Sequence, residues 1–373
     1  MMPAPAVLIV IGVAGLAYAN GANDASKGIA TLVGSGVTGY RRALAWATLW
    51  TVAGASAAAV MSGALIKTFS TGIINAGVQL TGSFPIAVLA GATAWVLLAS
   101  RTGMPVSTTH AITGALCGAG VVAFGWQGVR WMSLGNKVVL PLLLSPFIAL
   151  AAQWLLFPLL RPLLATIGSR CACVEMRLRV VAETNSGAML MQEDPVPMAL
   201  HVGHLENCRG RSTTVAGIAL DDALHWLSSG LTSFARGLND APKIIAPGLF
   251  ITSLVQIDAT FLFWIVGPAM GVGSYLAGRK VTETLAEKVT PMSTVEGLAA
   301  NSITSFLVAF ASRWGLPVST THVSAGAITA IGLRRTPRAV RWDTVTAMLE
   351  AWVITIPASA VMAVATWWCL ERL

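Results

Sequence analysis

The sequence Pro105-Val-Ser-Thr-Thr-His110 occurs a second time in this chain of 373 residues, as Pro317-Val-Ser-Thr-Thr-His322. The stretches around the two copies, residues 99–115 and 311–327, agree at 12 of 17 positions. A match of this length within one chain indicates an internal duplication. Duplicated polar motifs embedded in apolar sequence are typical of membrane proteins that are built from structural repeats.

A second pair of related stretches lies upstream of the first pair. Tyr18-Ala-Asn-Gly-Ala-Asn-Asp-Ala-Ser-Lys27 corresponds to Phe234-Ala-Arg-Gly-Leu-Asn-Asp-Ala-Pro-Lys243. The interval from Asn23 to Pro105 is 82 residues (105 − 23), and the interval from Asn239 to Pro317 is 78 (317 − 239). Both halves of the chain therefore carry the same two motifs in the same order.

The composition is that of a membrane protein. Hydrophobic residues make up 55% and charged residues 11%, whereas soluble domains contain about 25% charged residues. Residues 43–66 carry no charge and residues 136–160 carry only Lys137, and crossing a bilayer core takes roughly 20 apolar residues. We therefore predict an all-α polytopic protein of the cell (inner) membrane, surrounded by the lipid bilayer. The net charge of +8 comes from arginine-rich loops, so nucleic acid is not expected as a partner.

The distribution of cations indicates how the two halves are oriented. Arg41 and Arg42 follow the second apolar segment, whereas the matching loop 256–258 has no cation. Conversely, residues 278–290 carry three cations and their counterpart carries only Lys67. Because cations mark the cytoplasmic side, equivalent loops are expected to face opposite sides, which defines an inverted-topology repeat. Such a repeat needs an odd number of crossings per half.

Six apolar segments are visible in each half, so some of them must be broken or re-entrant. They lie at about 5–19, 25–37, 43–66, 84–100, 105–124 and 136–160, and at about 213–235, 241–255, 259–277, 291–312, 317–332 and 344–369. We expect the breaks at Asn20-Gly-Ala-Asn-Asp24 and at Gly103-Met-Pro105.

The predicted organisation has three parts: a first transmembrane repeat (1–160), a linker (161–211) and a second transmembrane repeat (212–373). The linker is the one long polar stretch between the two sets of apolar segments. Counting the crossings places the linker in the cytoplasm and both termini outside.

Asp24 and Asp240 are carboxylates at equivalent places inside apolar segments. A carboxylate at the bilayer centre costs about 3 kcal/mol on insertion scales, so such residues are functional candidates. Gly21 and Gly237 precede them and would allow the backbone to leave helical geometry, which would place Asn23 or Asp24 as the cap of a new helix. The alternative is a structural kink without a further role.

Two lysines and two histidines accompany the motifs. Lys27 and Lys243 follow the aspartates by three residues, which puts each on roughly the same helix face as its aspartate. They either pair with the carboxylates or contribute charge to a bound anion. His110 and His322 close the second motif and are either helix-packing residues or proton carriers.

The Pro-Val-Ser-Thr-Thr-His runs predict helix starts. Proline is favoured in the first turn, and Ser107, Thr108, Ser319 and Thr320 supply hydroxyls beside unpaired backbone amides. A helix N-terminus of this kind attracts anions, and two of them related by inverted symmetry would direct donors at one tetrahedral oxyanion. The alternative for any single hydroxyl is a hydrogen bond between helices in lipid.

Together the motifs resemble those of the PiT family of inorganic phosphate transporters, which also includes a bacterial sulfate permease. The resemblance spans everything except the linker. It implies a symporter of inorganic phosphate coupled to Na⁺ or H⁺, with no other cofactor. Carried onto this sequence, it implies two half-sites that bind the substrate: Asn23, Asp24, Ser107, Thr108 and Thr109 in the first half, and Asn239, Asp240, Ser319, Thr320 and Thr321 in the second.

One departure from the family pattern concerns the coupling ion. Sixteen residues before Pro317 (317 − 301), family members often carry Glu, whereas this chain has Asn301, with Glu296 a turn earlier. If that Glu helps to hold the cation, the choice between Na⁺ and H⁺ is open. The oligomeric state, a homodimer included, is open as well.

Two acidic residues at the site favour phosphate over sulfate. Phosphate near neutral pH still carries a proton, which Asp24 or Asp240 can accept, whereas sulfate has no donor. The preference holds unless both carboxylates are engaged by cations, and sulfate remains the alternative substrate. An intramembrane phosphatase-type enzyme is disfavoured because the sequence has no HExxH and no GxSxG motif. A passive channel is the third alternative.

The linker carries a group of potential metal ligands: Cys171, Cys173, His201, His204 and Cys208. A disulfide is not expected in a reducing compartment, and Cys and His bind zinc when four of them converge. The spacing is irregular, with a gap of 28 residues between Cys173 and His201 (201 − 173). Either the linker is a loosely structured loop or these residues bind a structural metal.

Overall fold

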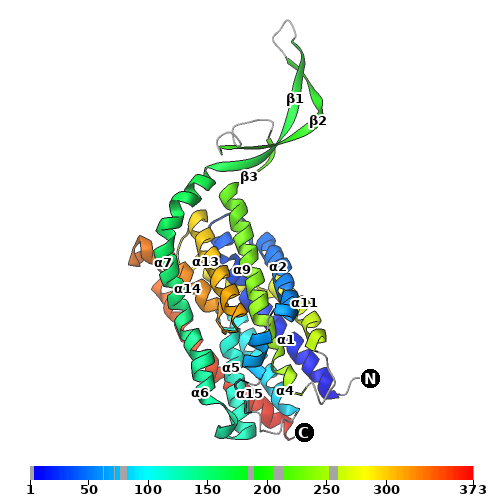
Figure 1. Ribbon diagram of the computed structural model, residues 1–373, viewed down its shortest axis with the longest axis vertical. Coiled ribbons are helices and arrows are strands. Elements are labelled where there is room, and N and C mark those ends of the chain that lie inside the picture. The colour runs from blue at the N-terminus through cyan, green and yellow to red at the C-terminus, as the bar shows by residue number, and fades with distance from the viewer. Residues whose placement is uncertain are drawn as a thin grey trace.

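The computed structural model describes residues 4–61, 63–70, 72–75, 82–183, 189–204, 214–251 and 259–372. It is a bundle of long helices with a small sheet at one end (Figure 1). Within the described residues, seven helical stretches are long and apolar enough to cross a membrane: Pro5–Gly34, Tyr40–Met61, Ser83–Thr102, Trp131–Gly168, Thr260–Ala277, Thr294–Arg313 and Trp342–Leu370. The chain is a multi-pass membrane protein.

The elements follow one another in two similar series. The first half contains α1 (Ala4–Gly34), α2 (Tyr40–Met61), α3 (Gly63–Ser70), α4 (Ser83–Thr102), α5 (Thr108–Phe124), η1 (Trp126–Gly128), α6 (Trp131–Leu134), η2 (Gly135–Val139) and α7 (Leu140–Gly168). The strands β1 (Arg170–Glu183), β2 (Met189–His204) and β3 (Thr214–Ala219) come next. The second half contains α9 (Leu220–Ile245), η3 (Gly248–Ile251), α11 (Ala259–Ala277), α12 (Arg279–Glu287), α13 (Thr294–Arg313), α14 (Thr320–Arg335), η4 (Pro337–Ala339) and α15 (Trp342–Leu370).

The predicted break at Asn20-Gly-Ala-Asn-Asp24 is wrong. α1 continues through this motif and joins the apolar segments that the sequence separates as 5–19 and 25–37. α9 likewise continues through Asn239 and Asp240. Asn23 and Asp24 therefore lie within a helix and cap none.

The glycines of the same motif have a different role, which is to let helices approach closely. A Cβ atom added to Gly21 would lie 2.1 Å from the Met270 carbonyl oxygen of α11. A Cβ atom on Gly237 would lie 2.4 Å from the Thr51 carbonyl oxygen of α2. The two motif glycines thus mark the crossings of α1 with α11 and of α9 with α2.

The predicted break at Gly103-Met-Pro105 is confirmed, as is the helix start that follows it. α4 ends at Thr102, and Gly103 has the left-handed φ of 78°. α5 begins at Thr108, where the Ser107 side chain accepts a hydrogen bond from the His110 amide (3.3 Å). Pro105 lies two residues before this cap, so it helps to end the preceding segment and is not part of the first turn.

The second half repeats this arrangement. α13 ends at Arg313, Gly315 has a φ of 67°, and Ser319 caps α14 by accepting from the His322 amide at 3.3 Å. Each half therefore contains a helical hairpin, α4–α5 and α13–α14, whose two arms are joined by a short non-helical loop.

The helices of one half pack on those of the other in a reciprocal manner. α1 packs on α11 and α9 on α2, while α15 covers the α4–α5 hairpin and α7 packs against α13 and α14. In Figure 1 both termini lie at the end of the bundle opposite the sheet, and α1 and α9 run in opposite directions. The α4–α5 hairpin lies towards the termini and the α13–α14 hairpin towards the sheet (Figure 1).

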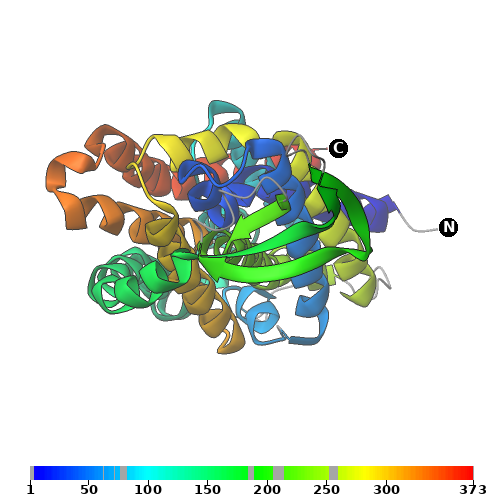
Figure 2. The same cartoon turned by 90° about the horizontal axis from the view of Figure 1, so that it is seen from above.

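The linker contains a three-stranded antiparallel sheet with the order β2-β1-β3. Its strands lie across one end of the helix bundle when the molecule is viewed from above (Figure 2). Regular strands replace the loose loop that the sequence analysis allowed. The sequence does indicate a strand here, because Met176, Leu178 and Val180 alternate with arginines at the period of two that is typical of strands.

Candidate functional site

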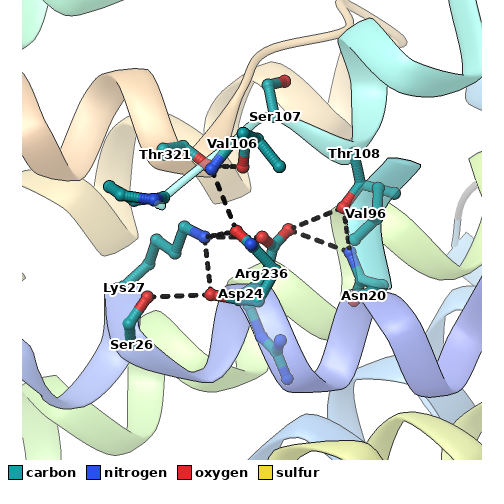
Figure 3. A network of polar contacts seen from close by, with 12 residues as sticks. Asn20, Asp24, Ser26, Lys27, Val96, Val106, Ser107, Thr108, Arg236 and Thr321 are labelled. Carbon is teal, nitrogen blue, oxygen red and sulfur yellow. Dashed lines mark hydrogen bonds and ion pairs between the residues drawn. The ribbon is translucent and has the colours of Figure 1, made fainter. Parts of the chain in front are cut away.

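Charged and polar side chains from α1, α5, α9 and α14 meet where the loops of the two hairpins touch the middle of α1 and α9. Lys27 Nζ lies 2.6 Å from Asp24 Oδ1 and also donates to the Asn23 carbonyl (2.8 Å). The other oxygen of Asp24 accepts from the Thr108 hydroxyl of α5 (3.3 Å). Figure 3 shows Lys27, Asp24 and Thr108 directed at one another.

Asp240 and Lys243 form the corresponding pair on α9. Lys243 Nζ lies 3.4 Å from Asp240 Oδ1, which also accepts from the Asn239 side chain at 2.9 Å. Asp24, Lys27, Asp240 and Lys243 are all exposed by 3% or less. Charges buried to this degree must be paired or hydrogen-bonded, and both carboxylates satisfy that requirement with a lysine of their own helix.

The two aspartates are bridged by a residue of α1. Asn20 Nδ2 donates to Asp24 Oδ2 (2.9 Å) and to Asp240 Oδ2 (3.2 Å). The same nitrogen lies 3.1 Å from the Thr108 hydroxyl. One side-chain amide thus ties the carboxylates of the two halves to the start of α5.

Asn23 and Asn239 hold the hairpin loops in place. Asn23 Nδ2 donates to the Ser100 hydroxyl (3.2 Å) and the Met104 carbonyl (2.9 Å), and its Oδ1 accepts from the Val106 amide (3.1 Å) and from Lys27.

Asn239 repeats this arrangement on the second hairpin. It donates to the Val318 carbonyl at 3.2 Å and accepts from the Ser312 hydroxyl at 3.1 Å.

The side-chain amide of Asn23 uses both of its donors and accepts two hydrogen bonds at its oxygen. In this conformation it has no hydrogen-bonding capacity left for a ligand.

The third residue of each Ser-Thr-Thr run reaches into the other half. Thr109 Oγ1 accepts from Lys243 Nζ (2.9 Å). Thr321 Oγ1 donates to the Val106 carbonyl (2.8 Å), and Figure 3 shows these two residues side by side. Lys243 also donates to the Val318 carbonyl at 2.9 Å. The loops of the two hairpins are therefore cross-linked by hydrogen bonds.

The helix starts provide unused donors between these cross-links. The first intrahelical bond of α5 runs from the Ala111 amide to the Ser107 carbonyl (3.0 Å), and the equivalent bond of α14 runs from Val323 to Ser319 (3.0 Å). Helix geometry leaves the amides of the two preceding threonines in each helix without an intrahelical acceptor. Together with the hydroxyls of Ser107 and Thr109 in α5, and of Ser319 and Thr320 in α14, each start presents a small set of donors and the positive end of a helix dipole.

His110 and His322 meet between the two hairpins. Their ring centroids are 4.7 Å apart, and the His322 ring also stacks on Trp352 at 3.9 Å. His322 Nδ1 lies 3.0 Å from the Leu142 carbonyl. His110 Nδ1 and His322 Nε2 have no hydrogen-bond partner among the described residues. Both rings therefore pack at the junction of the two halves.

Two residues of this cluster are missing from the sequence-derived set, namely Asn20 and Arg236, which occupy equivalent positions in the two motifs. Arg236 is fully buried and donates to the Thr51 hydroxyl (2.6 Å) and the Ser274 hydroxyl (3.2 Å). Figure 3 draws Arg236 together with the residues of the Asp24 network. Arg236 could have been found from the sequence, because an arginine inside an apolar membrane segment is a functional candidate by default.

Two candidates for ion coupling lie at different distances from the cluster. Asn301 is buried and donates to the Gly28 carbonyl at 3.0 Å, one residue beyond Lys27. Glu296 is far from the aspartates, since it completes the capping box of α13 with Ser293 and pairs with Arg335. The structure therefore does not bring Glu296 to the site.

The linker does not assemble the proposed metal site from its described residues. Cys171 is disulfide-bonded, so the expectation that the linker holds no disulfide is wrong and this sulfur is not a free thiolate. Cys173 pairs with His201 across β1 and β2, whereas His204 is three residues further on and points to the opposite face of the strand. The part of the chain that the structure describes has no group of three potential ligands. Cys208 lies outside the described residues.

A buried cluster of paired charges and helix starts, built from both halves of a membrane bundle, is typical of membrane transporters. Residues 20–363 match the phosphate transporter family, PHO4. A protein of Pyrococcus furiosus named as a phosphate permease is 30% identical over 96% of this chain and 94% of its own length. The chloroplastic inorganic phosphate transporter 2-1 of Arabidopsis thaliana is 28% identical over 96% of this chain and 71% of its own length.

A solved structure described as the sodium-dependent phosphate transporter shares the fold. Its TM-score is 0.78 over the whole of both chains, at 24% sequence identity. The chain belongs to the phosphate transporter family, and the resemblance to inorganic phosphate transporters that its motifs carry is confirmed. It is a transporter and not an enzyme.

Proposed function

We propose that this chain is a secondary active symporter that moves inorganic phosphate across the cytoplasmic (inner) membrane, driven by a gradient of Na⁺ or H⁺. The observation that carries the proposal is the meeting of two helix starts, α5 and α14, beside the paired charges of α1 and α9. Hydrogen bonds from Lys243 to Thr109 and from Thr321 to Val106 join the halves at this point. One anion between the starts would receive donors from both halves.

In this proposal the residues of the cluster have distinct roles. The first-turn amides of both helices donate to the phosphate oxygens, as anions at helix N-termini require. The hydroxyls of Ser107, Thr109, Ser319 and Thr320 add further donors, whereas those of Thr108 and Thr321 donate to Asp24 and to the Val106 carbonyl. Asn23 and Asn239 keep the hairpin loops against α1 and α9. Lys27 and Lys243 supply positive charge while they neutralise the carboxylates.

The proposed division of the chain is a first repeat (1–160), a linker (161–211) and a second repeat (212–373). The opposite directions of α1 and α9 and the position of the sheet away from both termini support inverted topology (Figure 1). We infer a cytoplasmic linker and external termini from the loop cations, with the disulfide at Cys171 as an exception to the usual absence of disulfides from a reducing compartment. The exposed apolar face of α7, with Leu143, Phe147 and Leu159, is available to lipid or to a second copy in a homodimer.

Uptake into proteoliposomes tests the function. Radiolabelled phosphate should accumulate above the external concentration when an ion gradient is imposed, and it should be recovered unchanged inside. Equilibration without accumulation would indicate a passive channel. No uptake under any gradient, by protein that is inserted and folded, would refute the proposal.

Sulfate is the second candidate substrate. Asp24 and Asp240 each accept from a lysine and from Asn20, so both carboxylates are engaged by cations and keep only part of their acceptor capacity for a phosphate O–H. This engagement weakens the discrimination against sulfate that two free carboxylates would give. Competition for phosphate uptake by excess sulfate separates the two substrates.

A further inference from the structure

We propose that a pocket between α7, α13 and α14 binds the phosphate head group of an anionic glycerophospholipid. The pocket lies on the surface of the bundle and is separate from the buried cluster between the two helix starts. A lipid bound here goes beyond the proposed function, because its recognition does not depend on what the chain transports.

The pocket is formed by both halves of the chain, where α7 packs beside α13 and α14 (Figure 1). Its volume is about 550 Å³, which lies within the usual range for small-molecule sites. The lining residues come from α7, from the start of α13 and from the end of α14: Phe157, Arg161, Ala165, Ser293, Val295, Glu296, Arg334 and Arg335.

A proline of α7 fixes Arg334 in this pocket. Pro158 has no amide hydrogen, so the Trp154 carbonyl four residues earlier lacks its helical donor. Arg334 Nη1 donates to this carbonyl at 2.8 Å, and its guanidinium lies 5.3 Å from the centre of the Phe157 ring. The opposite edge of the guanidinium, with Nε and Nη2, makes no hydrogen bond to the residues that the structure describes. Such an edge binds two oxygens of a phosphate group.

Arg161 supplies a second guanidinium to the pocket. It is exposed and follows Phe157 by four residues, which puts the two side chains on one face of α7. Within the described ranges of the chain, no hydrogen bond or ion pair engages Arg161. Arg335, in contrast, is neutralised by Glu296, to which it donates from two nitrogens. Three arginines and one glutamate therefore leave a charge of +2 (3 − 1) for a ligand.

The level of Arg161 along α7 is that of the membrane surface on the side of the sheet. It lies seven residues before the end of α7 at Gly168 (168 − 161), which is about 10 Å along the helix. Strand β1 begins two residues after Gly168, at Arg170. Basic pockets between transmembrane helices on the cytoplasmic side are typical binding sites for anionic lipid head groups, and the side of the sheet is the one that we infer to be cytoplasmic.

The surroundings of the pocket favour a lipid over a soluble phosphate compound. On the side of Arg161 away from the sheet, large apolar side chains of α7 are exposed: Trp154 by 49%, Leu155 by 59% and Leu159 by 73%. Trp154 precedes Arg161 by seven residues, so it lies on nearly the same face of the helix. An acyl chain can therefore cover this apolar surface while the phosphate of the same lipid contacts the two arginines.

A lipid in this position also links the two halves of the chain. Its phosphate would contact Arg161 of α7 in the first half and Arg334 of α14 in the second. We therefore expect the bound lipid to stabilise the packing of α7 on the α13–α14 hairpin and to raise the unfolding temperature.

Lipid binding to purified full-length protein in detergent tests the inference. Phosphatidylglycerol and phosphatidylcholine with the same acyl chains are compared by native mass spectrometry. The anionic lipid should bind at least about tenfold more tightly, because only its head group has a net negative charge. Equal affinity for the two lipids would overturn the inference. Displacement of bound phosphatidylglycerol by excess inorganic phosphate at constant ionic strength would also overturn it, because the pocket would then be a site for soluble anions.

The Arg161→Gln variant removes one of the two guanidinium groups without breaking a contact to the described residues, so it should fold. Its affinity for phosphatidylglycerol should fall at least about tenfold, and the lipid should no longer raise its unfolding temperature. Arg338→Gln, which removes an exposed arginine of η4 outside the pocket, is the matched control and should behave as wild type. Unchanged binding by Arg161→Gln, or an equal loss in Arg338→Gln, would contradict the inference.

Discussion

At the scale of single residues, Asp24 and Asp240 decide whether the cluster exists. We expect Asp24→Asn and Asp240→Asn each to reduce uptake by at least about tenfold, because each change leaves a buried lysine without its carboxylate. Breaking a buried ion pair costs about 3–5 kcal/mol, and the shorter contact of Asp24 (2.6 Å against 3.4 Å) predicts the larger effect there. Uptake is compared at equal membrane abundance.

The exposed Asp343→Asn change is the control for these variants and should transport normally. Wild-type uptake by both Asp24→Asn and Asp240→Asn would remove the proposed site. These two positions are the most informative single residues because the other charged and polar groups contact them. Each lysine pairs with the aspartate of its own helix, and Asn20 donates to both aspartates.

The sequence predicts most of this cluster and misses a specific part of it. The repeated Asn-Asp and Ser-Thr-Thr motifs lead to residues that do come together. Asn20 and Arg236 are missed because comparison of the two copies emphasises identical residues, whereas these equivalent positions differ. The bridging contact of Asn20 with Asp240, 220 residues away, depends on how α1 packs against α9, which no local pattern determines.

At the scale of helices, the starts of α5 and α14 combine structural and ligand-binding roles. Loss of a serine cap costs about 1 kcal/mol, so Ser107→Ala and Ser319→Ala should each lower thermal stability slightly. Phosphate binding should weaken modestly in each single variant and strongly in the double variant, because the adjacent threonines are partly redundant. Unchanged binding in the double variant would show that the anion is held elsewhere.

The crossings of α1 with α11 and of α9 with α2 depend on glycine. Gly21→Ala and Gly237→Ala would place a Cβ atom 2.1 and 2.4 Å from backbone carbonyl oxygens, so the helices must separate. We expect both variants to unfold at lower temperature and to lose uptake, since the shift displaces the aspartates three residues away. Gly39→Ala, with nothing within 4 Å of the added atom, should behave as wild type.

These helix crossings explain why one of the two predicted breaks was wrong. A glycine beside polar residues in an apolar segment fits equally a helix break or a close helix contact, and only tertiary packing distinguishes the two. At Gly103-Met-Pro105 the prediction was right because a proline and a serine cap specify the backbone locally. The strands of the linker were missed although the alternation in β1 indicates them.

At the scale of the whole molecule, the topology predicts which side of the membrane the linker faces. A cysteine introduced at Ser186, which lies in the linker outside the described residues, should not react with an impermeant thiol reagent in intact cells. It should react after the membrane is permeabilised. A cysteine at exposed Trp126, in η1 between α5 and α6, should show the opposite behaviour, because α6 lies at the end of the bundle away from the sheet (Figure 1). Robust labelling of position 186 from outside would reverse the proposed orientation.

The central claim is that one anion binds between the two helix starts and is held by both halves of the chain. A crystal structure with arsenate, a phosphate analogue with an anomalous signal, tests this claim most directly. We predict an arsenic peak within hydrogen-bond distance of residues from both 107–109 and 319–321. A peak that contacts one half only, or one in the exposed arginine pocket formed by Arg161, Arg334 and Arg335 with none between the helix starts, would contradict the account.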